Sequence, residues 1–254
     1  MPEVADRFSL AGQVAVVTGG SRGLGFEMSL AFAELGASVV IASRKGQACE
    51  AAAAEIAQRT GVRTLGVACN VGDWHQCDTL VETVYDAFGS VEILVNNAGL
   101  SPLYESLDTV SRDLFDKVVG INLAGPFRLA ALIGPRMAEG KGGSIINISS
   151  MSVHLPTPRE LPYAAAKAGL NTMTLGLATA FGPTVRVNAI QAGPFLTDIS
   201  NAWDRDVFTR FATDHLALGR AGSPEEIIGA AVFFASEASS YCTGSILRVD
   251  GGLH

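Results

Sequence analysis

The chain alternates short, largely apolar runs rich in β-branched residues with longer segments rich in alanine, leucine and glutamate. This alternation restricts its fold more than any other feature of the sequence. The apolar runs are predicted strands at residues 14–18, 39–42, 63–69, 91–95, 144–149, 185–190 and 245–249. Runs of this kind are typical of parallel strands covered on both faces by helices. We predict an α/β fold with a doubly wound parallel sheet of about seven strands and helices on both faces.

The composition fits one soluble domain that acts on small molecules. Of the 254 residues 48% are hydrophobic, enough for a buried core, and no stretch resembles a linker or a repeat. The formal net charge is −7 and lysine and arginine form no cluster, which excludes nucleic acid and anionic membranes as partners. We predict a single domain over residues 1–254, with a lid-like insertion at about 194–218.

The cysteines and the N-terminus indicate a cytoplasmic protein that uses no metal. Cys49, Cys69, Cys77 and Cys242 have no CxxC spacing and form no ligand cluster with the four histidines, so we expect reduced thiols. The first ten residues carry charges where a signal peptide needs an apolar stretch. The uninterrupted apolar runs are also too short for a membrane span.

A glycine-rich turn follows the first predicted strand and begins the first predicted helix. It reads Thr-Gly-Gly-Ser-Arg-Gly-Leu-Gly at 18–25, a GxxxGxG spacing. Glycines let the backbone turn tightly beside a pyrophosphate, and a helix N-terminus offers unpaired N–H groups and a positive dipole end. Such a turn also occurs as an ordinary tight turn, but its place in a strand–helix unit favours dinucleotide binding on a Rossmann fold.

The end of the second predicted strand indicates which dinucleotide is used. NAD-binding folds usually place an acid there to bind the ribose 2′-hydroxyl. Here Ser43, Arg44 and Lys45 follow the strand, and the first acid is Glu50. The guanidinium of Arg44, together with Arg22 of the glycine turn, suits a 2′-phosphate. We predict that NADP(H) is preferred over NAD(H); the alternative is that these side chains are only solvated charges.

Tyr163 and Lys167 are four residues apart in a predicted helix, so they share one face. An ordinary tyrosine titrates near pH ~10, and lowering its pKa to about 7 takes ~4 kcal/mol. A close cation lowers a pKa by roughly 1 to 3, so lysine alone is barely sufficient. An oxidised nicotinamide and the helix N-terminus would supply the remainder. On spacing alone, the pair is more often a coincidence of the helix surface.

Several motifs together remove that ambiguity, because they resemble the short-chain dehydrogenase/reductase family over nearly the whole chain. The resemblance rests on the glycine turn at 18–25, Asn-Asn-Ala-Gly at 96–99, Asn122, Ser150, the Tyr163-x-x-x-Lys167 pair, Thr-Gly at 243–244 and Val-Asp-Gly-Gly at 249–252. Within the family, the sequence looks most similar to bacterial gluconate-type sugar-acid dehydrogenases and 3-oxoacyl reductases. The resemblance implies an NADP(H)-dependent oxidoreductase that interconverts a ketone and a secondary alcohol.

The resemblance also implies a role for each matching residue. Tyr163 is the expected acid/base, Lys167 lowers its pKa and holds the nicotinamide ribose, Ser150 orients the substrate oxygen, and Asn122 holds a water that relays protons. Asn70 stands where the family usually has aspartate, and it retains an acceptor for the adenine amino group. The expected cofactor contacts are Gly19, Ser21, Arg22, Gly23, Leu24, Gly25, Ser43, Arg44, Asn70, Val71, Asn97, Ala98, Gly99, Tyr163, Lys167, Gly193 and Thr197.

The loop at 151–162 is expected to line the substrate mouth. Arg159 would clamp an acidic substrate if it faced the site, but it also suits pairing with Glu160 or exposure to water. His154 is a weaker candidate in the same loop. Trp203, Phe208 and Phe211 of the insertion are as suited to packing it down as to touching substrate.

Other functions remain open on the same fold. A non-catalytic NADP(H)-binding sensor or structural subunit is one, because a fold does not determine function. An NADPH-dependent enoyl reductase is another, although Ser150 beside Tyr163 favours a carbonyl. The family's usual assembly implies a homotetramer built on the long helices that follow Ser111 and Tyr163.

Overall fold

A seven-stranded parallel sheet forms the centre of the structure, a computed structural model that describes residues 3–197, 200 and 204–254. The strands are β1 (Val14–Thr18), β2 (Ser38–Ser43), β3 (Thr64–Ala68), β4 (Ile93–Asn96), β5 (Gly143–Ser150), β6 (Val185–Ala192) and β7 (Ile246–Val249). They lie in the order β3-β2-β1-β4-β5-β6-β7, and each neighbouring pair is parallel. The predicted doubly wound sheet is confirmed.

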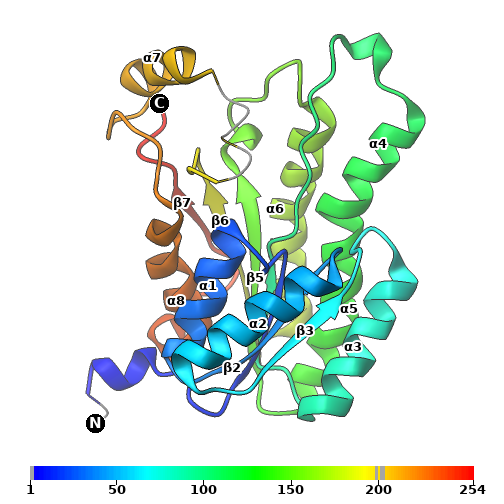
Figure 1. Ribbon diagram of the computed structural model, residues 1–254, viewed down its shortest axis with the longest axis vertical. Helices are drawn as coiled ribbons and strands as arrows, with labels where there is room; N and C mark the ends of the chain where they lie inside the picture. The colour runs from blue at the N-terminus through cyan, green and yellow to red at the C-terminus, as the bar shows by residue number, and fades with distance from the viewer. Residues whose placement is uncertain (1–2, 198–199, 201–203) are drawn as a thin grey trace.

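Helices cover both faces of this sheet (Figure 1). They are α1 (Gly23–Glu34), α2 (Gly46–Thr60), α3 (Trp74–Phe88), α4 (Arg112–Val119), α5 (Gly125–Glu139), α6 (Leu161–Phe181), α7 (Arg205–His215) and α8 (Ile228–Ala235). Short 3₁₀ turns lie at Ala5–Phe8, Leu107–Thr109, Met151–Val153, Pro224–Ile227 and Glu237–Ser239. A π-helical turn, η3 (Gly120–Ala124), joins α4 to α5.

Two hydrophobic cores, one on each face, hold the layers together. Side chains of α1, α2 and α8 pack on one face of the sheet, and those of α3, α5 and α6 pack on the other. Successive residues of β1 serve opposite cores: Ala15 and Val17 belong to the first, Val16 to the second. This division follows from the alternation of side chains along a strand, and it explains why both kinds of position are apolar.

The predicted strands agree with the observed ones to within two residues at each end. The two edge strands of the sheet, however, are not buried on both faces as predicted. β7 is exposed at three of its four positions, including Ile246 and Leu247, and β3 is only partly buried. An edge strand has one neighbouring strand, and helices cover it less completely than they cover the central strands. The apolar content of an edge strand therefore overstates its burial within a single chain.

One helical stretch reaches the length and hydropathy of a membrane span. It is the stretch Arg112–Glu139, which combines α4, η3 and α5 and has a mean hydropathy of 1.4 over its most apolar part. Half of that part is buried inside the fold, as in a core helix, so length and composition are weak grounds for a span. Polar residues interrupt this stretch, so it contains no long uninterrupted apolar run in the sequence.

Candidate active site

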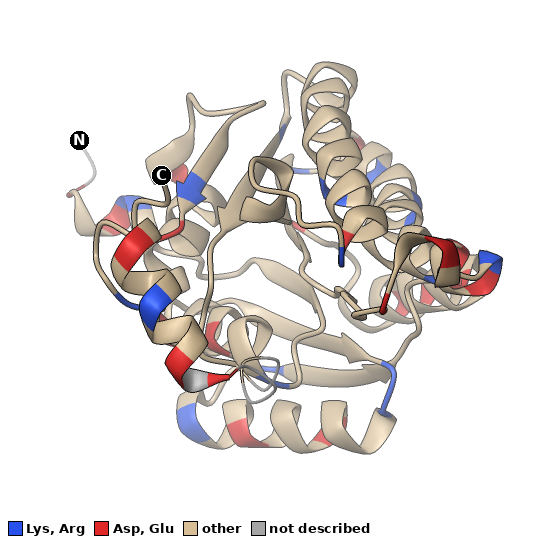
Figure 2. Cartoon of the chain, turned by 90° about the horizontal axis from the view of Figure 1, so that it is seen from above, with Lys and Arg blue, Asp and Glu red and all other residues tan. Residues whose placement is uncertain are grey.

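The predicted site residues converge at the carboxyl ends of the central strands. Thr18 ends β1, Asn96 ends β4, Ser150 ends β5 and Ala192 ends β6. Figure 2 looks onto this end of the molecule, where charged residues lie mainly on peripheral helices and loops. In doubly wound sheets, ligands bind outside the carboxyl ends where the strand order reverses, which here is between β1 and β4.

The glycine turn closely contacts the loop that follows β4. Gly19 has a φ of +66°, and a Cβ there would lie 2.8 Å from Nδ2 of Asn97. A Cβ at Gly25 would overlap the carbonyl of Gly19. No side chain in the described part of the chain caps the N-terminus of α1, which begins at Gly23. The turn therefore presents bare backbone and uncapped helix N–H groups, which fit a pyrophosphate.

Thr18 and Asn97 tie this turn to the Asn-Asn-Ala-Gly loop. The Thr18 hydroxyl accepts from the N–H groups of Asn97 and Ala98, each at 3.0 Å, and donates to the carbonyl of Val95 at 3.2 Å. Nδ2 of Asn97 donates to the carbonyl of Thr18 at 2.8 Å. Two segments that are almost 80 residues apart in sequence are thus fixed side by side.

The two arginines predicted to select NADP(H) follow directly after two serines that bond to each other. Oγ of Ser21 in the glycine turn lies 3.1 Å from Oγ of Ser43 at the end of β2. Arg22 and Arg44 are the next residues along each segment, and both are exposed. The structure therefore brings together, at one corner, the two cations that the sequence places 22 positions apart.

The remaining predicted cofactor contacts lie around the same edge of the sheet. Asn70 follows β3, and its Oδ1 accepts from the N–H of Gly72 at 3.2 Å. Gly193 follows β6 and donates its N–H to the carbonyl of Val249 at 2.9 Å. Thr197 lies over the start of α1, because a Cβ at Gly23 would lie 3.5 Å from its Cγ2. Val71 and Leu24 lie beside these positions, Val71 buried and Leu24 partly buried.

Tyr163, Lys167 and Ser150 meet at the end of β5. Tyr163 lies in the first turn of α6, and Nζ of Lys167 is 5.7 Å from the centroid of its ring. That Nζ donates to the carbonyl of Ile148 at 2.7 Å. Ser150 lies close enough to Tyr163 to lower the pKa of its hydroxyl. These three residues, which are separated along the sequence, thus lie together in the fold.

Burial alters the acidity of both ionisable groups in this constellation. Burial raises the pKa of Tyr163, the Ser150 hydrogen bond lowers it, and the charge of Glu160 raises it. Burial lowers the pKa of Lys167 from 10.5 to about 8. The chain's own groups therefore make Tyr163 a weaker acid than a free tyrosine. A positive charge close to the phenol is needed to reverse that direction.

Asn122 lies in the π-helical turn η3 and is held by backbone groups. Its Nδ2 donates to the carbonyls of Leu100 and Val118 at 2.8 and 2.9 Å, and its Oδ1 accepts from the N–H of Leu100 at 3.2 Å. Gly99 lies between Asn122 and Lys167, since a Cβ there would be 3.2 Å from Oδ1 and 3.9 Å from Nζ. π-turns occur frequently at functional sites, and this one brings the fourth predicted catalytic residue to the neighbourhood of Lys167.

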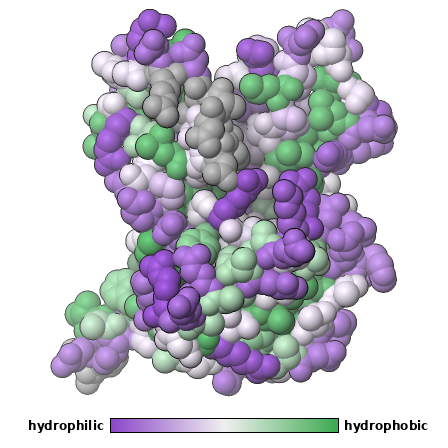
Figure 3. All heavy atoms as spheres, in the orientation of Figure 1, coloured by the Kyte–Doolittle hydropathy of each residue, from purple (hydrophilic) through white to green (hydrophobic). Residues whose placement is uncertain are grey.

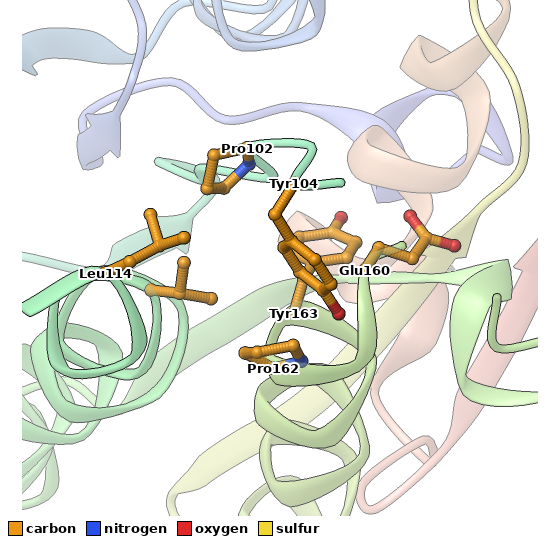
Figure 4. Close-up of a pocket in the computed structure, with 7 residues that line it drawn as sticks. Pro102, Tyr104, Leu114, Glu160, Pro162 and Tyr163 are labelled. Carbon is orange, nitrogen blue, oxygen red and sulfur yellow. The ribbon is translucent and has the colours of Figure 1, made fainter. Parts of the chain in front are cut away.

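A pocket beside Tyr163 is lined by Glu160, which lies in the loop expected at the substrate mouth, and by Tyr104, which no sequence motif indicated (Figure 4). The pocket is lined by Pro102, Tyr104, Leu114, Val118, Glu160, Pro162 and Tyr163. The Tyr104 hydroxyl accepts from the N–H of Leu161 at 3.0 Å. This bond joins the loop after β4 to the start of α6. The pattern of residues along the sequence does not predict a contact between segments so far apart. Glu160 lies three residues before Tyr163, and this closeness in sequence is what indicates a place near the site.

The surface near this pocket is apolar on the side of α4. Leu103, Leu107 and Phe115 are exposed large hydrophobic side chains in and before α4. On the face seen in Figure 3, hydrophobic residues gather on the right-hand lobe, where Figure 1 places α4. The surface beside this pocket is therefore apolar where α4 borders it.

The two basic residues proposed for the substrate loop do not line the pocket. Arg159 and His154 are both exposed. Glu160, by contrast, lines the pocket, so the loop contributes an acidic group to it. Among the described residues, no group of three or more His, Cys, Asp or Glu side chains gathers as metal ligands would.

The insertion at 194–218 carries α7 and packs on the segment that follows Ser150. Phe208 and Phe211 belong to a small apolar cluster with Met151 and Leu253, and their ring centroids are 6.1 Å apart. Trp203 lies outside the described residues. The aromatic residues that the structure describes therefore pack the insertion against the 3₁₀ turn beside Ser150 and against the C-terminus.

Comparison with known proteins agrees with this geometry. A family model described as enoyl-(acyl carrier protein) reductase matches residues 19–254. L-rhamnose 1-dehydrogenase (NAD(P)(+)) of Azotobacter vinelandii is 38% identical over 250 residues, which cover 96% of this chain and 97% of the relative. The 5-keto-D-gluconate 5-reductase of Escherichia coli K12 is 32% identical over 250 residues, with 98% of each chain covered. The expected likeness to gluconate-type enzymes is confirmed.

Solved structures agree as well. The L-sorbose reductase of Gluconobacter frateurii, complexed with NADPH and L-sorbose, superposes with a TM-score of 0.91. It is 32% identical, and the match covers 97% of this chain and 98% of that chain. The likeness therefore extends over the whole sheet and its surrounding helices.

Proposed function

The chain belongs to the short-chain dehydrogenase/reductase family, and from this membership we propose that it is an NADP(H)-dependent enzyme that interconverts a ketone and a secondary alcohol. The observation that carries the proposal is the meeting of Ser150, Tyr163 and Lys167 at the end of β5. Oxidoreductase activity on CH–OH groups with NAD(P) follows from the family. The cofactor preference and the residue roles are the proposed part.

The glycine turn fits the pyrophosphate of a dinucleotide, because a Cβ at Gly19 or Gly25 would close the approach to its backbone. Bound NADP(H) supplies or accepts the hydride. We assign the 2′-phosphate to Arg22 and Arg44, whose segments are joined by the bond between Ser21 and Ser43. The other predicted cofactor contacts border the same edge of the sheet and suit the adenosine and nicotinamide ends.

Tyr163 gives its hydroxyl proton to the carbonyl oxygen in reduction and takes it back in oxidation. Ser150 lies beside Tyr163 and lowers the pKa of its hydroxyl, so both hydroxyls suit one substrate oxygen. Lys167 supplies a positive charge near the tyrosine ring and becomes easier to deprotonate because it is buried. Asn122, on the π-turn, supports proton relay on the far side of Gly99.

Substrates of the sugar and polyol class fit the proposal best. Relatives named for L-rhamnose, mannitol, 5-keto-D-gluconate and L-sorbose all match nearly the full chain. The enoyl reductase alternative corresponds to the description of the matching family model, but the Ser150–Tyr163 pair favours a carbonyl oxygen. The sensor alternative requires no Tyr–Lys–Ser constellation, and this chain retains one.

A screen of NADPH consumption tests the proposal directly. The purified chain is offered ketoses, keto acids, aliphatic ketones, ketoacyl thioesters and enoyl thioesters at equal concentrations. We expect turnover of at least one ketone and none of the enoyl thioesters. Turnover of enoyl thioesters alone would support the double-bond alternative, and binding of NADPH with no turnover of any compound would support the sensor.

We also propose that the protein is a homotetramer and that it is located in the cytoplasm. Phe115, Phe127 and Leu175 are exposed on α4, α5 and α6, the helices on which the family's assembly is built. Light scattering should then report four times the 26.4 kDa mass of one chain. A mass of one chain at micromolar concentration would contradict the assembly.

A further inference from the structure

We propose that Glu160 makes the substrate mouth selective for neutral, hydroxylated ketones and alcohols over compounds that carry a carboxylate. This inference rests on the proposed ketone–alcohol interconversion and adds the substrate class. It reverses the expectation attached to Arg159, which would have favoured acidic substrates.

The position of Glu160 places a carboxyl group beside the reacting hydroxyl. It immediately precedes α6 and lies three residues before Tyr163, and the two side chains line one pocket together with Tyr104. In Figure 4, the Glu160 side chain lies on the Tyr163 side of the pocket, and its carboxyl group points away from Leu114 and Pro102. Glu160 is therefore a charged side chain in the same pocket lining as the hydroxyl to which the proposed ketone would bind.

Two loops hold the carboxyl group in that place. Burial raises the pKa of Glu160, and the neighbouring Thr157 and Ser101 partly offset that rise because they favour the charged form. Ser101 follows β4 and Thr157 follows β5, so Glu160 bridges the two loops that border the pocket. A carboxylate offers about four acceptor positions, so this group is suited to accept a hydrogen bond from a substrate hydroxyl.

The charges around the pocket leave its acidic character uncompensated. Of the seven described residues that line it, Glu160 alone carries a carboxyl group, and none is a lysine, arginine or histidine. Arg159 is exposed outside the lining, and Lys167 donates to the carbonyl of Ile148. The charge of Glu160 also raises the pKa of Tyr163, so its field reaches the reacting group. A substrate carboxylate would meet the same field.

A matched pair of substrates tests this selectivity. L-sorbose and 5-keto-D-gluconate share one carbon skeleton and the same ketone, and they differ in a terminal hydroxymethyl group or carboxylate. We compare kcat/KM for both at pH 8 with NADPH in the wild type, in Glu160→Gln and in Glu105→Gln. Glu105 is an exposed acid in the same loop as Tyr104 and is a matched control for the loss of one negative charge.

We expect the wild type to prefer L-sorbose. Glu160→Gln should raise the ratio of 5-keto-D-gluconate to L-sorbose about tenfold, mainly through KM of the acid, as removal of one like charge at a few ångströms predicts. Glu160→Asp retains the charge and should keep the ratio within about twofold of wild type. Glu105→Gln should do the same, because an exposed charge is screened by solvent.

Three results would overturn the inference. One is an unchanged ratio in a folded Glu160→Gln protein that still binds NADPH. The second is an equal change in Glu105→Gln, which would assign the effect to general charge. The third is a wild type that reduces the acid as well as the sugar, or reduces neither while other ketones are turned over. Failure of the proposed function is distinguishable, because then no ketone in the screen would be reduced.

Discussion

At the scale of single residues, Lys167 combines a functional position with an energetic cost. Its ammonium is buried, and burial lowers its pKa from 10.5 to about 8. The unfolded chain holds this proton up to about pH 10.5, whereas the folded chain holds it only up to about pH 8. The stability of the fold therefore rises with pH between these values, and below pH 8 the full cost of the buried charge is present.

Lys167→Met should stabilise the fold at pH 7 while it removes activity. The gap between the two pKa values corresponds to about 3 kcal/mol, from which loss of the hydrogen bond to Ile148 subtracts about 1. We expect the free energy of unfolding to rise by about 2 kcal/mol at pH 7, and this gain to shrink by about 2 kcal/mol at pH 9.5. Denaturant titrations at both pH values measure it. Lys117→Met, at an exposed lysine of α4, should show no such pH dependence.

The second prediction for single residues concerns Arg22 and Arg44 and the preference for NADPH over NADH. Two guanidinium groups beside a 2′-phosphate should make NADPH bind at least tenfold more tightly than NADH, because hydrogen bonds to charged groups contribute roughly 1.5–3 kcal/mol. Removing both as Arg22→Ala/Arg44→Ala should abolish most of the preference. Fluorescence titration gives both dissociation constants. Arg59→Ala, at the other end of α2, is the matched control, and equal constants in the wild type would refute the assignment.

At the scale of elements, the sequence predicts what depends on local pattern. The strands and the helix that carries Tyr163 and Lys167 follow from periodicity and composition, and the glycine turn follows from its place between β1 and α1. The π-turn at η3 does not follow from local pattern. The place of Tyr104 does not follow from it either, since it depends on which loops meet at the end of the sheet.

A buried polar chain links β4, β5 and α6 beneath the site. Nδ2 of Asn96 donates to Oδ1 of Asn147, and Nδ2 of Asn147 donates to Oγ1 of Thr174, each at 2.9 Å. All three residues are essentially inaccessible to solvent. Buried polar groups cost stability unless they are paired, so this chain fixes α6 against the sheet in one register.

Thr174→Val should therefore destabilise the fold by about 1–3 kcal/mol, because it leaves Nδ2 of Asn147 buried without its acceptor. Thr172→Val changes the same atoms at an exposed position of α6 and should change stability by less than about 0.5 kcal/mol. Urea unfolding of the two variants makes the comparison. Equal effects would mean that the buried chain does not contribute to the attachment of α6.

At the scale of the whole molecule, a rigid sheet supports loops that choose the ligand. The glycine turn and the catalytic constellation lie at the ends of central strands, where two cores fix the backbone. The pocket is formed instead by the loop after β4, by α4 and by the start of α6, and the insertion at 194–218 packs on the turn after β5. Reaction class therefore follows from motifs on the sheet, and substrate class depends on tertiary contacts that the sequence alone does not reveal.

The central claim is that Tyr163 is the acid/base of a ketone–alcohol oxidoreductase, and Tyr163→Phe tests it most directly. The measurement pairs NADPH oxidation with the best ketone of the screen and NADPH binding by fluorescence, with Tyr85→Phe as control at a half-buried tyrosine of α3. We predict that Tyr163→Phe lowers kcat at least about 100-fold, the usual contribution of a general acid, while NADPH affinity stays within about threefold and Tyr85→Phe remains active. Turnover within tenfold of wild type in Tyr163→Phe would contradict the account.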